Sequence, residues 1–297
     1  MTFLSYLING ISLGSVYAII ALGYTMVYVI AKMLNFAHGD VIMVGAYVCY
    51  LVFNNVGLPW WLSIIISMAV CTVLGIVIEK LAYKPLRAAS SLAVLITAIG
   101  VSYFLQNAAL LLWTSSPKNF PTSFFEIKGD KGFTIFDGQL QISYTALVTI
   151  ICCIVIMIAL TLFTEKTKMG KAMRAVSENK EAARLMGINV NKTISITFAI
   201  GSGLAAIAGV LLCSAYPILQ PTTGSMPGIK AFTAAVFGGI GSIPGAFLGG
   251  ILLGILEIFA KAYISTQLSD AIVFAVLIIM LLVKPTGLLG KKIMEKV

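Results

Sequence analysis

The sequence predicts an all-α polytopic membrane protein with about eight to nine transmembrane helices. Only 10% of the 297 residues are charged, whereas 59% are hydrophobic. Soluble domains carry about 25% charged residues, so this chain lacks the polar side chains that a water-covered surface needs. In lipid, a spanning backbone must satisfy its own hydrogen bonds, which long apolar runs do by forming helices. Lipid is therefore the solvent that the composition predicts.

Apolar runs that approach the length of a membrane span recur along the whole chain. A spanning helix needs roughly 20 apolar residues. Such runs cover residues 4–30, 41–56, 60–83, 91–113, 143–165, 193–216 and 268–286. A further stretch, 228–263, is too long for one ordinary span and is interrupted by GGIGSIPG at 238–245. We expect residues 1–297 to form a single transmembrane domain, and the first run, which lacks a cleavage site, to be a retained span.

The distribution of basic residues predicts the orientation of the chain. Lysine and arginine gather in 84–90, in 166–192 and in the C-terminal tail, whereas acidic and basic residues balance in 114–141. Because cytoplasmic loops carry an excess of basic residues, we expect 114–141 outside and the other three segments inside. The parity of crossings then favours two crossings by 228–263 over a dip with one crossing, and places the N-terminus outside. Within 114–141, the stretch FFEIKGDKGFTIF predicts a small β-hairpin.

Two short segments predict broken helices within the membrane. One is LNFAHGD at 34–40 and the other is GGIGSIPG at 238–245. Glycine permits close approach and positive φ, and proline lacks a hydrogen-bond donor, so neither segment continues a regular helix easily. A broken helix at membrane depth is tolerated where it is buried in protein or lines a cavity. The candidate pathway or helix-break residues are Asn35, His38, Gly39, Asp40, Gly238, Gly239, Gly241, Pro244 and Gly245.

A possible internal repeat precedes the two breaks. The stretches GSVYAIIALG at 14–23 and GSGLAAIAG at 201–209 both begin with Gly-Ser and end with Gly. Corresponding interrupted segments in two halves of a transporter indicate a repeat around a central pathway. The match is short and degenerate, so the sequence favours the repeat no more than its absence.

Motifs for enzyme or metal chemistry are missing from the sequence. The stretch GLLGKK at 287–292 has neither the spacing nor the hydroxyl group of a phosphate-binding loop, and no zinc-protease motif or nucleophile elbow occurs. The five cysteines lie inside apolar runs without metal-ligand spacing, and His38 is the only histidine. We interpret the thiols as packing residues. The net charge of +9 comes from short basic loops rather than from a nucleic-acid groove.

Two acidic residues lie near the predicted interior of the membrane. Glu257 has Lys261 one helical turn later, which favours an ion pair at the interfacial end of a helix. Asp40 lies where a helix restarts, so we expect it to cap that helix. A charge inside the bilayer costs about 2.5–3.5 kcal/mol on insertion scales, and no chain of carboxylates forms a proton or sodium relay. The chain therefore carries no visible energy source for transport.

A polar segment, SENKEAARLMGINV at 177–190, lies in the longest basic loop. Ser177 or Asn179 is expected to cap a short helix over about 180–186, and Gly187 to end it in the left-handed conformation. Ala182 and Ala183 give this helix a face with little side-chain bulk, which another protein could approach closely. The alternative is that basic loops are usual in membrane proteins and alanine is a good helix former. That alternative leaves the spacing Glu-Ala-Ala-x-x-x-Gly unexplained.

Three motifs together resemble one family of transport proteins. EAARLMGI at 181–188 resembles the ATPase-docking segment of ABC importer permeases. NFAHGD at 35–40, EAARLMGINV at 181–190 and GGIGSIPGAFLGG at 238–250 occur in this order and resemble the branched-chain amino acid permeases, specifically the LivH-type subunit. The likeness runs along nearly the whole chain. It implies that the residues that couple this chain to an ATPase are Glu181, Ala182, Ala183 and Gly187.

The resemblance also implies the function and the partners. Such permeases pair with a homologous second permease of the LivM type, with two cytoplasmic ATPases and with a periplasmic binding protein that presents leucine, isoleucine or valine. ATP and Mg²⁺ bind the ATPases, so this chain is expected to bind no cofactor and to be no enzyme. It is expected to cross the bacterial inner membrane several times, surrounded by lipid. The alternatives are a self-sufficient secondary transporter, favoured by the two breaks, and a passive channel; amide or urea substrates also stay open.

Overall fold

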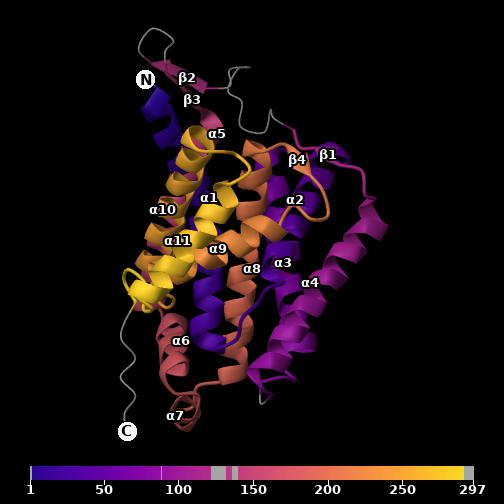
Figure 1. The fold of residues 1–297 in the computed structure, drawn as a ribbon. Coiled ribbons are helices and arrows are strands. Elements are labelled where there is room, and N and C mark those ends of the chain that lie inside the picture. The colour runs from indigo at the N-terminus through magenta and orange to yellow at the C-terminus, as the bar shows by residue number, and fades with distance from the viewer. Residues whose placement is uncertain (1, 88, 122–131, 136–139, 291–297) are drawn as a thin grey trace.

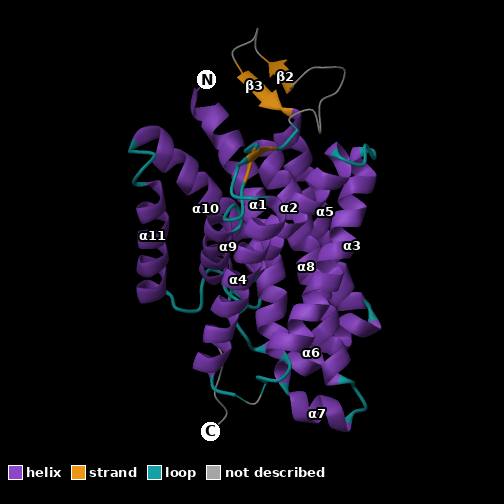
Figure 2. Ribbon diagram, turned by 90° about the vertical axis from the view of Figure 1, so that its right-hand side faces the viewer, coloured by secondary structure: helices purple, strands orange, loops and turns teal. Residues whose placement is uncertain are grey.

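Helices form nearly all of the secondary structure in the computed structural model, which describes residues 2–87, 89–121, 132–135 and 140–290 (Figures 1 and 2). This arrangement confirms the predicted polytopic helical class. A π-helical turn, η1 (Glu79–Tyr83), continues α3. The α-helices are α1 (Thr2–Ala31), α2 (His38–Asn54), α3 (Trp60–Ile78), α4 (Ser91–Trp113), α5 (Tyr144–Lys166), α6 (Lys168–Glu178), α7 (Lys180–Leu185), α8 (Val190–Ala215), α9 (Ser225–Gly238), α10 (Ile243–Tyr263) and α11 (Ser269–Val283).

Helix α1 runs through the middle of the bundle. It is apolar on every side, and all its residues from Ser12 to Val27 are buried. A helix that is hydrophobic all round is expected either in a core or in contact with lipid, and here α8, α9, α10 and α5 surround it. The polypeptide's first predicted span is therefore its most buried helix.

Small residues allow α1 and α10 to pack backbone against backbone. A Cβ atom on Gly254 would lie 2.1 Å from the amide nitrogen of Gly14, and one on Gly250 would lie 2.5 Å from the Cα of Ala18. Lipid tails are as apolar as leucine, so helices in membranes associate through close packing of this kind. The spacing of four residues between Gly250 and Gly254 places both on one face of α10.

The outer helices α3, α4 and α5 bury few of their residues within the chain. Their exposed side chains are large and apolar, as in Ile96, Leu111 and Val155. Such a surface suits lipid or another membrane subunit. Within the described residues, six helices are long and apolar enough to cross a membrane by length and composition: α1, α3 with η1, α4, α5, α8 and α10. Helices α2 and α11 are shorter and apolar.

Both predicted helix breaks occur in the structure. Residues 32–37 separate α1 from α2, and Lys32 takes a positive φ of 58° there. This first break lies earlier than predicted, because His38, Gly39 and Asp40 already form the first turn of α2. Residues 239–242 separate α9 from α10, with Gly239 at φ 102° and Gly241 at φ 109°. This second break is narrower than predicted, because Gly238 ends α9 and Pro244 and Gly245 belong to the first turn of α10, which Ser242 caps.

The strands are short and lie at one end of the bundle. Strand β1 (Lys118–Asn119) pairs antiparallel with β4 (Ile218–Leu219), and β2 (Gly132–Ile135) pairs with β3 (Leu140–Ser143). The second strand of the hairpin predicted within 124–136 is β2, and it pairs with the later strand β3. The predicted turn and first strand lie outside the described residues.

Candidate functional site

The short helices α2 and α9 begin beside each other in the interior of the protein. A Cβ atom on Gly224 would lie 1.8 Å from the carbonyl oxygen of Gly39, and one on Gly228 would lie 2.8 Å from the Cα of Gly39. Only glycine permits this approach of the two backbones. Two helix N-termini, each with partial positive charge, therefore meet at one point.

The carboxylate of Asp40 lies at this junction. Gln106 of α4 donates from Nε2 to Asp40 Oδ1 at 2.9 Å, and the same nitrogen lies 3.2 Å from Ser225 Oγ at the start of α9. The expected capping role of Asp40 is wrong, because Ala37 is the N-cap of α2 and Asp40 is the third helical residue. Its negative charge still complements the positive helix ends. Gln106 was missed by the sequence analysis, although a glutamine inside an apolar run was a visible signal.

His38 is fully enclosed between α1 and α2. Its ring lies 4.6 Å from the ring of Tyr24, and a Cβ atom on Gly23 would lie 2.7 Å from His38 Nε2. Gly23 therefore makes the space that the imidazole occupies. Among the described residues, neither His38 Nε2 nor Thr25 Oγ1 has a hydrogen-bond partner, although both atoms are buried.

The two predicted breaks line one small cavity. Asn35 of segment 32–37 and Ile240 of segment 239–242 border a space of about 10 Å³, together with Tyr24, Thr25 and Phe232. This volume is just enough for a water molecule. The breaks, although far apart in sequence, thus meet around the end of α1.

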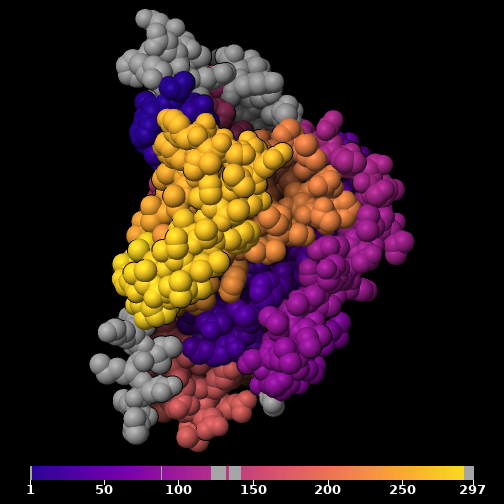
Figure 3. Space-filling model, viewed as in Figure 1, coloured from indigo at the N-terminus to yellow at the C-terminus, as the bar shows by residue number. Residues whose placement is uncertain are grey.

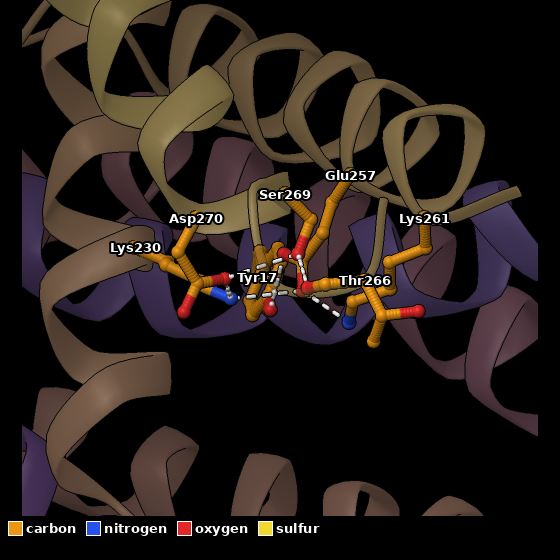
Figure 4. Close-up of polar contacts among 7 residues, drawn as sticks. All are labelled: Tyr17, Lys230, Glu257, Lys261, Thr266, Ser269 and Asp270. Carbon is orange, nitrogen blue, oxygen red and sulfur yellow. Dashed lines mark hydrogen bonds and ion pairs between the residues drawn. The ribbon is translucent and has the colours of Figure 1, made fainter. Parts of the chain in front are cut away.

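A network of charged side chains joins α1, α9, α10 and α11 (Figure 4). Lys230 of α9 lies 2.8 Å from Glu257 of α10 and 2.6 Å from Asp270 of α11. Lys261 approaches the same Glu257 oxygen to 2.6 Å, and Tyr17 Oη donates to the other oxygen at 2.8 Å. Two lysines and two carboxylates compensate one another, which a buried charge such as that of Glu257 requires.

The structure adds three residues to the expected pair of Glu257 with Lys261. That pair is present near the C-terminal end of α10, and Glu257 is only 1% exposed. Lys230, Tyr17 and Asp270, which the sequence analysis missed, explain how the carboxylate is tolerated. A lysine in the otherwise apolar α9 was the signal that could have found this network.

The segment 177–190 folds as predicted. Asn179 Oδ1 accepts hydrogen bonds from the amides of Glu181 and Ala182, which caps α7. Gly187 takes φ 80°, and its amide bonds the carbonyl of Arg184 at 2.9 Å. The amide of Ile188 bonds the carbonyl of Ala183 at 3.0 Å, which completes a Schellman motif. These bonds set the direction in which the chain leaves α7.

The exposed surface of α7 differs from the predicted one. Ala182 is exposed, whereas Ala183 is buried against the chain itself, so the two alanines do not form one free face. Leu185 and Met186 are 89% and 82% exposed beside Ala182. A large apolar pair at the tip of a polar loop is typical of a docking surface. The sequence analysis missed this pair.

Lys180 ties α7 to the central helix. Its Nζ donates to the carbonyl oxygen of Ala31, the last residue of α1, at 3.0 Å. A cation at a helix C-terminus is favourable because the last carbonyls lack helical partners. Burial lowers the pKa of the Lys180 amine, and the nearby cations of Arg87, Lys32 and Arg184 lower it further.

Long apolar helices, internal helix breaks and a compensated buried charge network define the class: this is a polytopic membrane protein. A family model described as a branched-chain amino acid transport system permease component matches residues 6–281. The chain belongs to this permease family.

Individual relatives match over nearly the full length. The chain is 44% identical to the high-affinity branched-chain amino acid transport system permease protein BraD of Pseudomonas aeruginosa, with 99% of this chain and 98% of BraD covered. It is 42% identical to the corresponding permease protein LivH of Escherichia coli, with the same coverage. The fold is also similar to a solved structure, PsaBC from Streptococcus pneumoniae in complex with Fab, with a TM-score of 0.50 and 15% sequence identity. The match covers 94% of this chain and 91% of the chain in that structure. That likeness concerns the fold alone.

Proposed function

We propose that this chain is the membrane-spanning permease subunit of an ABC importer for leucine, isoleucine and valine in the bacterial inner membrane. The observation that carries the proposal is the 42–44% identity, over nearly the whole chain, to relatives named as high-affinity branched-chain amino acid permeases. The partners are a LivM-type second permease, two ATPases that bind ATP and Mg²⁺, and a periplasmic binding protein. The chain itself binds no cofactor and catalyses no reaction.

The ATPases dock on α7. The geometry supports this because Ala182, Leu185 and Met186 form an exposed apolar patch at one end of the molecule, where Figure 1 places α7. Glu181 and Arg184 border the patch with charges that orient a partner, and Gly187 fixes the turn behind it. Ala183 lies on the buried side of α7, where its small side chain allows the helix to pack closely against the rest of the chain.

The second permease covers the face that Figure 3 displays. In this view N-terminal residues, drawn in indigo, reach the surface between α11 and α4. The end of α1 and the segment 32–37 contain partly exposed residues, such as Tyr28, Leu34 and Phe36, next to the small internal cavity. Substrate passes along this face, where residues 32–37 and 239–242 leave the backbone free of regular helix.

The membrane crossings follow an inverted repeat. Segment 32–37 leads into α2 from the end that carries α7, because Ala31 contacts Lys180. Segment 216–224 leads into α9 from the opposite end, because β4 pairs with β1. The two short helices then meet at their N-termini, as inverted repeats place them. The partner of the first break is thus 216–224 rather than 238–245. With α2, α9 and α11 counted, residues 1–297 form one domain of eight to nine spans.

The decisive experiment is uptake of radiolabelled leucine by vesicles that contain this chain, its second permease, the ATPases and the binding protein. We expect uptake to require ATP inside the vesicles and the binding protein outside them, and to be blocked by vanadate. Uptake driven by a proton or sodium gradient without ATP would support a secondary transporter instead. Flux without any energy source would support a channel, and ATP-driven uptake of labelled urea or amides without uptake of leucine would overturn the substrate class.

A further inference from the structure

We propose that Glu79 and Tyr83 are positioning residues for transport, which connect the start of α8 to the broken segment 32–37 through hydrogen bonds. The inference rests on the proposed function, since it concerns how movement of α7 reaches the pathway. Both side chains are fully buried, and both belong to η1. Single turns of π-helix are rare in proteins, and those that occur often lie at functional sites.

The first connection runs from α7 to the start of α8. The Schellman bonds at Gly187 and Ile188 end α7, and Asn189 then caps α8 by accepting the amide of Lys192 at 3.0 Å. Only residues 186–189 separate the two helices, and each of their turns is hydrogen-bonded. A displacement of α7 by a docked ATPase therefore moves the first turns of α8 with it.

The second connection runs from α8 to η1. Asn191 and Ser195 lie four residues apart on one face of α8. Asn191 accepts a hydrogen bond from the guanidinium of Arg87, which also pairs with Glu79 Oε1. Ser195 Oγ donates to the other carboxylate oxygen of Glu79 at 2.6 Å. Both oxygens of a buried carboxylate are thus held by groups that α8 positions, and leaving either one unpaired is costly.

The third connection runs from η1 to the break. Tyr83 lies four residues after Glu79, and its Oη donates to Asn35 Oδ1 at 2.8 Å. The ring of Tyr83 also packs on Phe198 of α8, with ring centres 5.2 Å apart. Asn35 in turn accepts the amide of His38, the first residue of α2, at 3.1 Å. A shift of Tyr83 therefore acts on the start of α2, where its glycine contact with α9 lies.

A direct contact secures the other end of the same segment. Lys180 of α7 holds the carbonyl of Ala31, immediately before residues 32–37. The segment is consequently attached to the α7–α8 region at Ala31 and, through η1, at Asn35. Asn35 also borders the cavity that Ile240 lines, so a shift of Asn35 changes the packing at both helix breaks.

The test measures leucine imported per ATP hydrolysed by the reconstituted complex. Tyr83→Phe removes one hydroxyl group and keeps the ring, so we expect assembly and ATP hydrolysis to persist while this ratio falls by about two- to tenfold. The matched control is Tyr47→Phe, because the buried Tyr47 Oη has no hydrogen-bond partner among the described residues. The control should leave the ratio unchanged.

A second pair of variants separates coupling from folding. Ser195→Ala should lower the ratio as Tyr83→Phe does, whereas Ser195→Thr keeps the donor to Glu79 and should restore it. A wild-type ratio in Tyr83→Phe and Ser195→Ala, or a loss of membrane abundance alone, would overturn the positioning role. Failure of the wild-type complex to import leucine with ATP would instead overturn the proposed function, so the two results are distinguishable.

Discussion

The contact between α1 and α10 makes a sharp prediction about Gly254. In Gly254→Ala, the new Cβ atom would lie 2.1 Å from the Gly14 amide nitrogen and 2.2 Å from its Cα. Non-bonded carbon atoms prefer a separation of about 3.5–4.0 Å. The two helices must therefore move apart by about 1.5 Å at this turn. A side-chain rotation cannot relieve the clash, because the atoms that the new Cβ meets belong to the backbone of Gly14.

The destabilisation follows from overpacking and from looser packing one turn away. Inserting a methyl group into a closely packed interior typically costs about 1–3 kcal/mol. Separation of the helices also weakens the packing of Gly250 on Ala18, where the same close approach occurs. We expect the free energy of unfolding to fall by about 3 kcal/mol, the upper end of that range. The reason is that the new methyl group meets backbone atoms of both Gly14 and Gly10.

The assay is thermal unfolding of the detergent-solubilised permease, with membrane abundance measured in parallel. We expect Gly254→Ala to lower the midpoint by on the order of 5 °C. The matched control is Gly100→Ala in α4, since a Cβ atom there meets no other atom within 4 Å. Alanine is the better helix former, so the control should be neutral or slightly stabilising. Equal stability of Gly254→Ala and wild type would refute the packing argument, and equal damage in the control would refute its location.

Three further predictions concern the network, the docking surface and the orientation. Glu257→Leu should cost about 3–5 kcal/mol in unfolding free energy, because it leaves Lys230 and Lys261 facing each other without their shared carboxylate. Lys261→Met should cost less than about 1 kcal/mol, because its side chain is partly exposed; the reverse ranking would contradict the buried network. Ala182→Trp should leave the permease inserted but abolish ATP-driven uptake, and normal uptake with assembled ATPases would exclude docking at α7. A cysteine at Ser116 should react with an impermeant thiol reagent from outside and one at Lys171 from inside only, whereas reversed labelling would invert the topology.

The charge network and the proposed positioning residues lie in two different regions of the protein. Glu257, Lys230 and Asp270 hold α9, α10 and α11 together on one side of α1. Glu79 and Tyr83 lie on the side of α8 and of the segment 32–37. Helix α1 and the breaks at its end lie between them. Variants in the first region are expected to affect stability, and variants in the second to affect coupling.

Local features of this protein were readable from the amino-acid sequence. The shortage of charge predicts a membrane protein because no water-covered surface can be built without polar residues. Asn179 and Gly187 delimit α7 because capping and positive φ depend on the residue itself and its immediate neighbours. The breaks at 34–40 and 238–245 were also predicted, since glycine and proline act on their own stretch of backbone.

The tertiary structure alone decided which helices meet. Lys230 and Glu257 lie on opposite sides of the interruption within 228–263, and Asp40 and Gln106 lie far apart in the sequence. Nothing in the residues around either member of a pair indicates its partner. In a soluble protein the apolar stripe of a helix identifies its buried face, but in lipid both the core and the outer surface are apolar. The burial of Ala183, the meeting of α2 with α9 and the connection from Ser195 to Asn35 therefore had no signature in hydrophobicity. They depend on close backbone approach and on hydrogen bonds between distant segments, which exist only once the bundle has formed.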